Sequence, residues 1–597
     1  MSLGVALESL EGRQLIRSLA EIEPTYTFKH NLVQQVAYES LLATDRRSLH
    51  RMVGEALEQI HEDAPPELAE MLASHFERAG DTAKAIAYSA TAGEQAMRRF
   101  ATAEAASLYL RAIELARESF DEEQLLHFYK QRGRALELRA DYTIALSHYE
   151  ELEALGRERR APKLELAGII GAASLQAVPT PLFDPVKGLA NAERALALAK
   201  TIDDPAAQAK AYWLQMLVQN RTDAKAAIAA GEASLDIARR HALREQEAFT
   251  LNDIQSNYQV LGRSDRALHA LEEARPIWQE LDNLPMLADN LASTAMLHII
   301  LAEYDLGIER GRQAIAISER TGNLWGQSYG RVAIGLALFA RDDLGPAIRE
   351  CTRSIELSEQ AGFVYPQTAL RAGLSIAYLR AGDLSKAADL AARVRELEQL
   401  TPFPGQSNGD SALALVAIQA GDLDEAQRLL KGWGTSAEAV SPAMLDNFFV
   451  HAMAIWSYHL ARGAFGRALE VVDELMREFA KFQWRPLQGQ LLLTRARALL
   501  GLSRSAEAEA AFRASYDEMV HQGIDSGLWE VEAEWARVMV AEGKAREASR
   551  LLASAAAHVR AVAEGLSELG LADRFLGQAH VRRILDEAAA SDERQVQ

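Results

Sequence analysis

The stretch RAGDLSKAADLAARV, residues 380–394, holds the pattern from which the fold can be inferred. Gly382 suits a left-handed turn, because glycine adopts positive φ without steric cost. Apolar residues then follow at helical spacing, and the small Ala387 stands five positions after the glycine. The pattern predicts that one helix ends here, the chain reverses, and a second helix begins. Ala387 would let two helix backbones approach closely.

The same pattern recurs along most of the chain. Twelve turn markers can be aligned, and from Thr222 to Gly543 they recur about every 40 residues. The residue five positions after the marker is alanine in eleven of the twelve cases and isoleucine, Ile308, in the other. The markers are Gly80, Ala101, Ala140, Thr222, Gly262, Glu303, Asp342, Gly382, Gly421, Gly463, Gly501 and Gly543.

Each repeat is therefore predicted to be a helix hairpin. One hairpin cannot cover both of its apolar faces, so neighbouring hairpins must stack and bury a continuous core. The expected fold is an all-α solenoid with an extended inner surface. Two spacings depart from the period: residues 140–222 leave room for two units around a proline-rich turn at Pro179, Pro181 and Pro185, and the 21 residues from Gly80 to Ala101 indicate one shared helix.

The stretch IGLALFARDDLGPAIRECTRSIEL, residues 334–357, resembles the tetratricopeptide repeat. The small residue Gly335, the alanine Ala347 in the second helix and the helical spacing carry this resemblance. It implies a right-handed superhelix. The period of about 40 residues exceeds the family's usual 34 or so, which predicts longer helices.

Residues 28–58, FKHNLVQQVAYESLLATDRRSLHRMVGEALE, fit none of the repeats. The alternating aromatic residues of TYTFKH predict a short strand near Tyr26 to Lys29, and the apolar spacing after it predicts two helices. We expect residues 1–62 to form a winged-helix-like remnant or a cap, residues 63–590 to form the repeat array, and residues 591–597 to be disordered.

Residues 28–116 resemble the junction in bacterial signalling proteins where an ATPase of the STAND class leads through a winged-helix-like segment into tetratricopeptide repeats. Many members carry an adenylate or guanylate cyclase domain upstream, and others are transcription regulators. The resemblance implies that this chain is the C-terminal part of a longer protein. It contains no G-x-x-x-x-G-K-[ST] phosphate loop, so the ATPase and cyclase activities cannot be assigned to any residue here.

The composition limits the partners and the compartment. A net charge of −20, from 64 basic and 84 acidic residues, disfavours nucleic-acid binding. The single cysteine, Cys351, excludes an intrachain disulfide, and the N-terminal segment lacks the apolar stretch of a signal peptide. We expect a cytoplasmic protein with no membrane segment, and self-association is compatible with the sequence.

Catalytic motifs are weak. Ser328 lies in GQSYG, residues 326–330, but the motif stands in a helical run where no strand could form a nucleophile elbow. The 14 histidines show no metal-ligand spacing. The basic run at residues 156–163 is short and lies in an acidic chain. We therefore expect no catalytic site, no metal and no cofactor.

One set of residues is a candidate for ligand binding. Aromatic residues, glutamines and arginines stand at equal offsets before successive markers, so that stacked helices would align them into a ladder. The alternative is that the aromatic rings pack between repeats and the arginines pair with nearby acids. The residues are Trp325, Tyr365 and Trp484, Gln327, Gln367 and Gln406, and Arg331 and Arg371.

Two interpretations of function remain. The first is a non-catalytic regulatory array that binds a protein segment or small effector on its inner face and controls an upstream ATPase and a cyclase or transcription output domain. The second is a structural scaffold for self-association or complex assembly. The first rests on the family resemblance and the repeat architecture.

Overall fold

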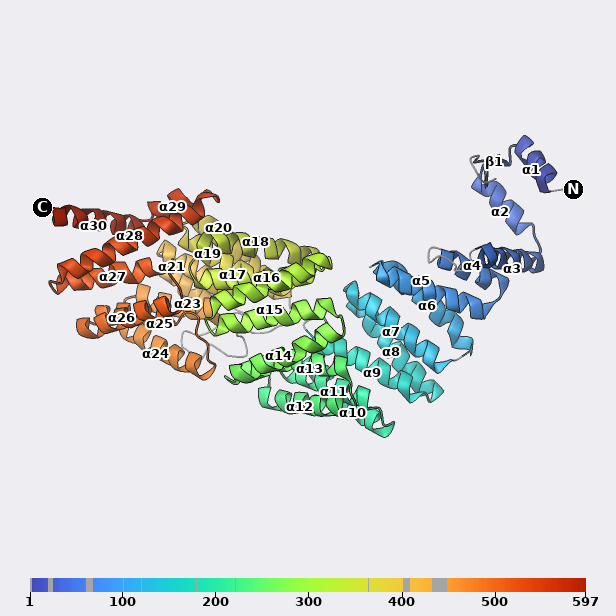
Figure 1. The fold of residues 1–597 in the computed structure, drawn as a ribbon, viewed down its shortest axis with the longest axis horizontal. Helices are drawn as coiled ribbons and strands as arrows, with labels where there is room; N and C mark the ends of the chain where they lie inside the picture. The colour runs from blue at the N-terminus through green and yellow to red at the C-terminus, as the bar shows by residue number, and fades with distance from the viewer. Residues whose placement is uncertain are drawn as a thin grey trace. The chain divides into compact units, whose positions relative to one another are not determined.

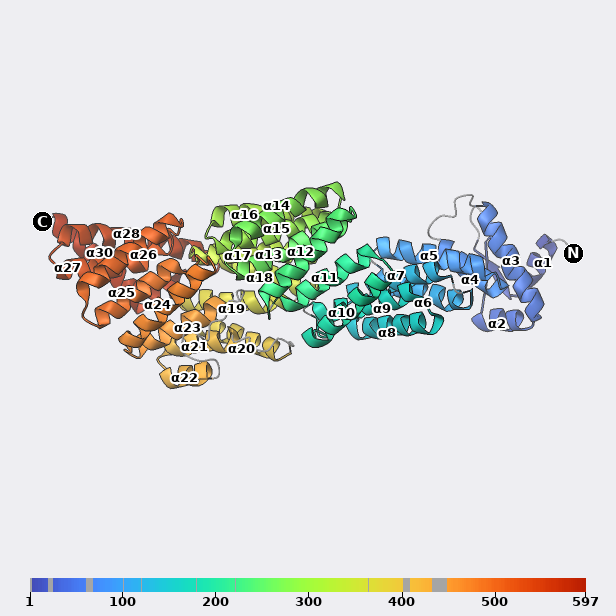
Figure 2. The same cartoon turned by 90° about the horizontal axis from the view of Figure 1, so that it is seen from below.

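The computed structural model describes residues 3–19, 25–60, 68–99, 101–119, 121–178, 180–220, 222–362, 364–400, 408–431 and 448–596. They form 30 helices and one sheet of two short strands, which confirms the predicted all-α solenoid of helix hairpins. The chain divides into two compact units, Met1–Ala172 and Ala173–Gln597. Consecutive helices pack side by side within each unit (Figures 1 and 2). Each helix in the described residues is too short or too polar to cross a bilayer.

The first unit contains the small sheet, which follows α1. β1 (Ile16–Ser18) pairs antiparallel with β2 (Tyr26–Phe28). The predicted strand and the two helices after it are confirmed, whereas the partner strand β1 was not predicted. A single helix, α5, fills the interval between Gly80 and Ala101, as expected. The helices are α1 (Leu3–Gly12), α2 (Asn31–Glu39), α3 (Ala43–Ile60), α4 (Ala69–Ala79), α5 (Thr82–Arg98), α6 (Thr102–Ser119), α7 (Glu122–Leu138) and α8 (Tyr142–Arg159).

The division between the units falls inside α9 (Pro162–Ala177). The second unit contains α10 (Pro185–Thr201), α11 (Pro205–Gln219), α12 (Ala224–Arg240), α13 (Arg244–Val260), α14 (Ser264–Glu280), α15 (Leu284–Ile300), α16 (Tyr304–Arg320), α17 (Leu324–Ala340), α18 (Leu344–Gln360), α19 (Val364–Arg380) and α20 (Leu384–Leu400). It continues with α21 (Asn408–Ala420), α22 (Leu423–Lys431), α23 (Phe448–Ala461), α24 (Phe465–Lys481), α25 (Gln488–Gly501), α26 (Ser505–His521), α27 (Leu528–Ala541), α28 (Ala545–Ser567), α29 (Ala572–Gly577) and α30 (Ala579–Val596).

The last helix, α30, extends into the stretch 591–597 that was expected to be disordered. Ser591 is buried, and its Oγ donates a hydrogen bond of 2.5 Å to Ser549 Oγ in α28.

The period of about 40 residues consists of two equal halves. Every helix from α13 to α20 has 17 residues, and each is preceded by a three-residue link. A residue with positive φ stands at the same place in each link of this series, because a left-handed residue reverses the chain there. These residues are Ala242, Gly262, Asp282, Ala302, Gly322, Asp342, Gly362 and Gly382.

Two of the predicted markers are displaced. In place of Glu303 the left-handed residue is Ala302, with φ of 59°. Gly501 is the last residue of α25, and Ser503 makes the turn with φ of 60°. Because of this shift, Ala506 is exposed and the helix contact is made by the fully buried Ala508. The role predicted for Ala506 was wrong.

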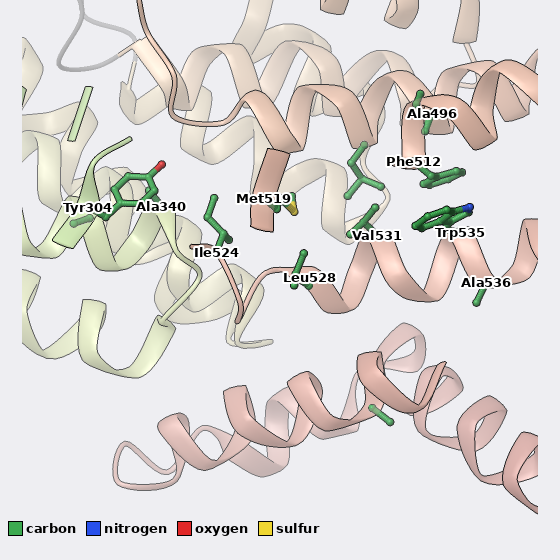
Figure 3. Close-up of a cluster of buried hydrophobic side chains, with 14 of the residues drawn as sticks. Tyr304, Ala340, Ala496, Phe512, Met519, Ile524, Leu528, Val531, Trp535 and Ala536 are labelled. Carbon is green, nitrogen blue, oxygen red and sulfur yellow. The ribbon is translucent and has the colours of Figure 1, made fainter. Parts of the chain in front are cut away.

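The second unit closes on itself, because its C-terminal helices pack against its middle hairpins. One apolar cluster contains residues of α15 to α17 together with residues of α25 to α28. In Figure 3, Tyr304 of α16 lies beside Ile524, which precedes α27. Tyr304 Oη donates to Gln522 Oε1 over 3.4 Å. Segments that are far apart in the sequence therefore share one core.

An ion network strengthens this closure. Arg380, at the end of α19, donates to Asp342 Oδ2 at 2.8 Å and to Glu530 Oε1 at 3.0 Å. Arg497 of α25 donates to Glu530 Oε2 and to Glu534 Oε1, both at 2.6 Å. Glu530 of α27 thus joins two arginines from helices far apart in the chain.

The backbones of distant segments of the second unit approach closely at two further places. A Cβ atom on Gly345, the second residue of α18, would lie 1.9 Å from the carbonyl oxygen of Gly565 in α28. A Cβ atom on Gly262 would lie 2.0 Å from the carbonyl oxygen of Lys481. Real Cβ atoms do not come this close, so both positions require glycine for the helices to meet.

A small apolar void beside the buried Cys351 leads to a stability prediction. A Cβ atom on Gly373 in α19, which lines this void, would meet no heavy atom within 4 Å. We expect Gly373→Ala to raise the free energy of unfolding by about 1 kcal/mol, because alanine favours a helix over glycine. Thermal unfolding measures the change.

Gly335→Ala is the matched control, since its Cβ atom would lie 2.6 Å from Cys351 Sγ. It is expected to destabilise the protein by about 1–3 kcal/mol through overpacking. A Gly373→Ala variant that melts below the wild type would show that the void is not available to a methyl group.

Candidate ligand-binding site on the inner face

Alternate helices of the second unit form one layer. α11 contacts α13, α15 contacts α17, α17 contacts α19, and α19 contacts α21. In a curved stack, the layer whose members touch each other lies on the inside of the curve. The odd-numbered helices from α11 to α21 therefore form the inner layer of the stack.

The predicted ladder lies largely in this layer, in α17 and α19. The guanidinium groups of its arginines reach glutamates in the neighbouring even-numbered helices. Arg331 donates to Glu350 at 2.8 Å and to Glu319 at 3.3 Å. Arg371 is 8% exposed and pairs with Glu359. Glu319 and Glu359 precede their arginines by the same interval in the chain, so the repeated arginine is matched by a repeated acid.

The ladder glutamines make a repeated contact as well. Gln327 Nε2 donates to the carbonyl oxygen of Ser318 over 3.5 Å, and Gln367 Nε2 donates to that of Ser358 over 3.4 Å. Gln208, at the equivalent place in α11, donates to a carbonyl near the end of α10 over 3.4 Å. These amides are additional donors, because the backbone N–H groups of Asn323 and Asp204 already donate to the carbonyl oxygens of Ser318 and Ala199.

The aromatic members have aromatic neighbours. The ring of Trp325 lies 5.2 Å from that of Tyr329, and the ring of Trp484 lies 6.4 Å from that of Phe479. Gln406 and the side chain of Tyr365 lie outside the described residues. Ligand binding by the ladder stays a prediction.

A different group of side chains makes a better candidate site. It lies on α11, α13 and α15, and sequence analysis did not find it. Trp213 Nε1 donates to Asp253 Oδ2 at 2.8 Å, and Asn252 Nδ2 donates to Asp289 Oδ2 at 2.8 Å. Lys210 Nζ lies 3.8 Å from the centre of the Trp213 ring. We call Lys210, Trp213, Asn252, Asp253 and Asp289 the acidic inner site.

Buried polar groups hold the acidic inner site in place. Asn290, which is fully buried, donates to Asn252 Oδ1 at 3.0 Å and to the carbonyl oxygen of Leu271 at 3.0 Å. Arg275 donates to Asn290 Oδ1 at 3.2 Å and to Thr294 Oγ1 at 3.1 Å. The amide of Asn252 is thus oriented so that its Nδ2 points to Asp289, because a satisfied buried network fixes its members.

The two carboxylates of the site lie in a low-polarity setting. Burial raises the pKa of Asp253 to about 7, and the charge of Asp289 adds to the rise. Burial also raises the pKa of Asp289 to about 6. The charge of Lys210 and the hydrogen bond from Trp213 lower the pKa of Asp253, but by less than burial and Asp289 raise it. Both carboxyl groups therefore bind protons more readily than exposed carboxyl groups do.

The structure does not support catalysis at the serine of GQSYG. Ser328 is fully buried, and its Oγ donates to the carbonyl oxygen of Ser354 at 3.0 Å. Ser354 Oγ donates back to the carbonyl oxygen of Ser328 at 2.9 Å. The pair ties α17 to α18. In the part of the chain that the structure describes, no group of three or more His, Cys, Asp or Glu side chains could hold a metal ion.

No protein-family model and no curated protein matches the chain. Among solved structures, it is similar to a Rap protein complexed with competence and sporulation factor, with 15% identity and a TM-score of 0.43, over 58% of this chain and 96% of that one. It is similar to aspartyl phosphate phosphatase F from Bacillus subtilis, with 14% identity and a TM-score of 0.38, over 58% and 92%.

A third similar structure is a Signal Transduction ATPase with Numerous Domains (STAND) protein with a tetratricopeptide repeat sensor from Pyrococcus horikoshii. The identity is 16% and the TM-score 0.35, over 72% of this chain. The match spans 58% of the length of that protein.

Proposed function

We propose that the protein is a non-catalytic sensor array whose inner face binds a peptide or small effector with a cationic group. The observation that supports this is the acidic inner site, where Asp253 and Asp289 stand on neighbouring inner helices beside an indole ring. An ammonium or guanidinium group placed there would neutralise carboxylates that burial disfavours. Amide and carboxylate groups nearby would orient the rest of the ligand.

The proposal extends to signalling output. Occupancy of the inner face would control an upstream ATPase and a cyclase or transcription domain, with residues 1–62 as the connecting winged-helix-like element or cap. The coding sequence before Met1 tests this part. An in-frame phosphate loop there supports it, and a natural start at Met1 with no open frame before it contradicts it. The net charge of −20 and the single cysteine support a cytoplasmic location and a partner other than nucleic acid.

The predicted ladder would extend the same surface along α17 and α19. Trp325 and Arg331 are the members to test, in the same titrations as the acidic inner site. A ligand that bridges both regions would lose affinity when Trp325 is replaced by leucine.

Asp253→Asn is expected to separate binding from stability. The amide keeps an oxygen that can accept from Trp213 Nε1 but removes a disfavoured charge. We expect the free energy of unfolding at pH 8 to rise by about 1 kcal/mol. Binding of a cationic peptide should weaken at least about tenfold. Thermal unfolding and calorimetric titration measure the two effects, with short lysine peptides as probes and their acetylated forms as chemical controls.

The pH dependence follows from the same carboxyl groups. Their pKa values are raised above the unfolded value of about 3.9, so the folded state binds extra protons and their contribution to stability falls as pH rises from about 4 to about 7. Affinity for a cationic probe should rise over pH 5 to 8, as Asp289 and then Asp253 ionise.

Asp236→Asn is the matched control, because Asp236 is exposed on α12 and pairs with Arg240. The substitution should change neither the free energy of unfolding nor the affinity for a cationic peptide. Equal affinity for a lysine peptide and its acetylated form would contradict cation recognition, and the absence of any peptide binding would contradict the sensor function.

A further inference from the structure

Two arginines form a second charged group in the second unit, of opposite sign to the acidic inner site. Arg275 lies on α14 and Arg310 on α16, and both helices pack against α15 (Figure 2). Both arginines are half-buried. Among the described residues, neither guanidinium group pairs with a carboxylate, and their hydrogen bonds go to neutral side chains instead. We call these two residues the arginine pair.

Two buried side chains of α15 hold the guanidinium group of Arg275. Its Nε donates to Asn290 Oδ1 at 3.2 Å, and its Nη2 donates to Thr294 Oγ1 at 3.1 Å. Asn290 is fully buried and Thr294 is 1% exposed, so the packing around them fixes both acceptors. Nη1 of Arg275 has no hydrogen-bond partner in the described part of the chain, so its two N–H groups are available as donors.

Arg310 stands beside the same part of α15. Gly307 lies one turn before Arg310 on the same face of α16, and a Cβ atom on Gly307 would be 3.2 Å from the carbonyl oxygen of Ala295. Arg310 Nη1 donates to Gln313 Oε1 at 2.9 Å. Its Nε is buried and has no hydrogen-bond partner within the described ranges. Buried N–H groups are normally satisfied, so this nitrogen calls for an acceptor from outside the chain.

The like charges of the arginine pair act on each other. Burial lowers the pKa of the Arg275 guanidinium group, the charge of Arg310 lowers it further, and Glu272 acts in the opposite direction. Glu272 is exposed and forms no ion pair with Arg275 in the described structure. Glu309, next to Arg310, accepts a hydrogen bond from Gln313 instead. Without an anion, the two positive charges therefore disfavour each other.

Other half-buried arginines of this unit have acidic partners. Arg331 donates to Glu350, and Arg497 donates to Glu530 and Glu534. The chain has 84 acidic and 64 basic residues, so a shortage of acids does not explain why the arginine pair has none. Charges left without partners beside a fixed guanidinium group are typical of a binding site.

We propose that Arg275 and Arg310 bind a phosphate group between α14 and α16. Two guanidinium groups present forked N–H donors and two positive charges, which match the oxygens and the double charge of a phosphate dianion. A carboxylate would neutralise only one of the two charges. The ligand is inorganic phosphate or a small phosphomonoester. The site does not depend on cation binding at the acidic inner site and goes beyond the proposed function.

Thermal unfolding and calorimetric titration of the full chain with inorganic phosphate test the site, with sodium chloride at the same ionic strength as the reference. Phosphate should raise the melting temperature of the wild type. Arg310→Gln should weaken phosphate binding at least about tenfold, because one of the two charged donors is lost. Without phosphate, Arg310→Gln should not lower the melting temperature, since the substitution removes a repulsive contact.

Two further variants separate geometry from charge. Arg275→Lys keeps the charge but loses the fork that Asn290 and Thr294 hold, so it should also weaken phosphate binding. Arg312→Gln is the matched control, because Arg312 is exposed on the same helix as Arg310 and the substitution removes the same charge. It should leave phosphate binding unchanged. Circular dichroism confirms that each variant is folded.

The choice of anion identifies the ligand. Acetate should bind more weakly than phosphate, and glycerol phosphate shows whether the site takes an ester. Tighter binding of glycerol phosphate than of inorganic phosphate assigns the site to a phosphomonoester, and the reverse order assigns it to free phosphate.

Three results would overturn the proposal. The first is a wild-type chain that phosphate stabilises no more than sodium chloride does. The second is an Arg310→Gln chain that binds phosphate as tightly as the wild type, or that melts several degrees lower without phosphate, which would make Arg310 a structural residue. The third is equal affinity for acetate and phosphate.

Discussion

Replacing Arg497 with methionine is expected to lower the free energy of unfolding of the second unit by about 2–4 kcal/mol. The change leaves Glu530 and Glu534 without the guanidinium group that donates to both of them. A partly buried carboxylate that loses its partner keeps its desolvation cost, which makes removal of one partner more harmful than the net contribution of the pair. Thermal unfolding at pH 7 measures the loss.

The effect of Arg497→Met should depend on pH. Burial raises the pKa of Glu530, but Arg497 and Arg380 outweigh burial and bring it down to about 2. A depressed pKa contributes stability above the unfolded value, about 4.3, and that contribution is lost as pH falls toward 2. The difference between variant and wild type should therefore be largest near neutral pH and shrink below pH 4.

Arg504→Met is the control for this prediction. Arg504 pairs with Glu507 on the surface of α26, and exposed pairs of this kind contribute about 0.2–1 kcal/mol. If both variants melt at the wild-type temperature, the network around Glu530 does not stabilise the closure of the second unit.

Gly345→Ala is expected to have the second largest effect, a loss of about 1–3 kcal/mol. The added methyl group would meet the carbonyl oxygen of Gly565, and two packed backbones cannot shift as a flexible side chain can. The helices α18 and α28 would have to separate. Hydrogen exchange should become faster in α28, and thermal unfolding should start at a lower temperature.

Gly466→Ala is the matched control for Gly345→Ala. Gly466 is the second residue of α24, as Gly345 is of α18, but its Cβ atom would meet nothing within 4 Å. The substitution should leave stability unchanged or raise it by up to about 1 kcal/mol. Equal behaviour of the two variants would show that the contact with Gly565 does not restrict position 345.

The fold was predictable because a local signal repeats. A turn residue such as Gly382 and a small residue such as Ala387 act within one hairpin, so each repeat can be recognised alone. The signal fails where another residue type adopts positive φ. Ala302 does so and was missed by one position, whereas Asp342 was predicted correctly. The turns at Ala242, Asp282 and Gly322, which lie between the predicted markers, were not recognised.

The candidate site was not predictable by the same reasoning. Trp213, Asp253 and Asp289 stand at different positions in their own helices and come together only because α11, α13 and α15 stack. The ladder residues were chosen because they stand at equal distances before successive turn markers. In helices of equal length, residues at equal distances from the turn have the same kind of neighbours. For Arg331 and Arg371, these surroundings include a glutamate at the same place near the end of the preceding helix, which gives the repetition a structural explanation.

The closure of the second unit also sets an order of events during synthesis. Tyr304 must wait for Gln522, 218 residues later, before its hydroxyl group finds its partner. At a translation rate of about 5–20 residues per second, the wait is roughly 10–40 seconds. During that time the apolar residues of α15 to α17 that belong to the shared core have no cover from α25 to α28. A nascent chain at this stage offers a binding surface to chaperones, and a ribosome stalled before α27 would leave it open.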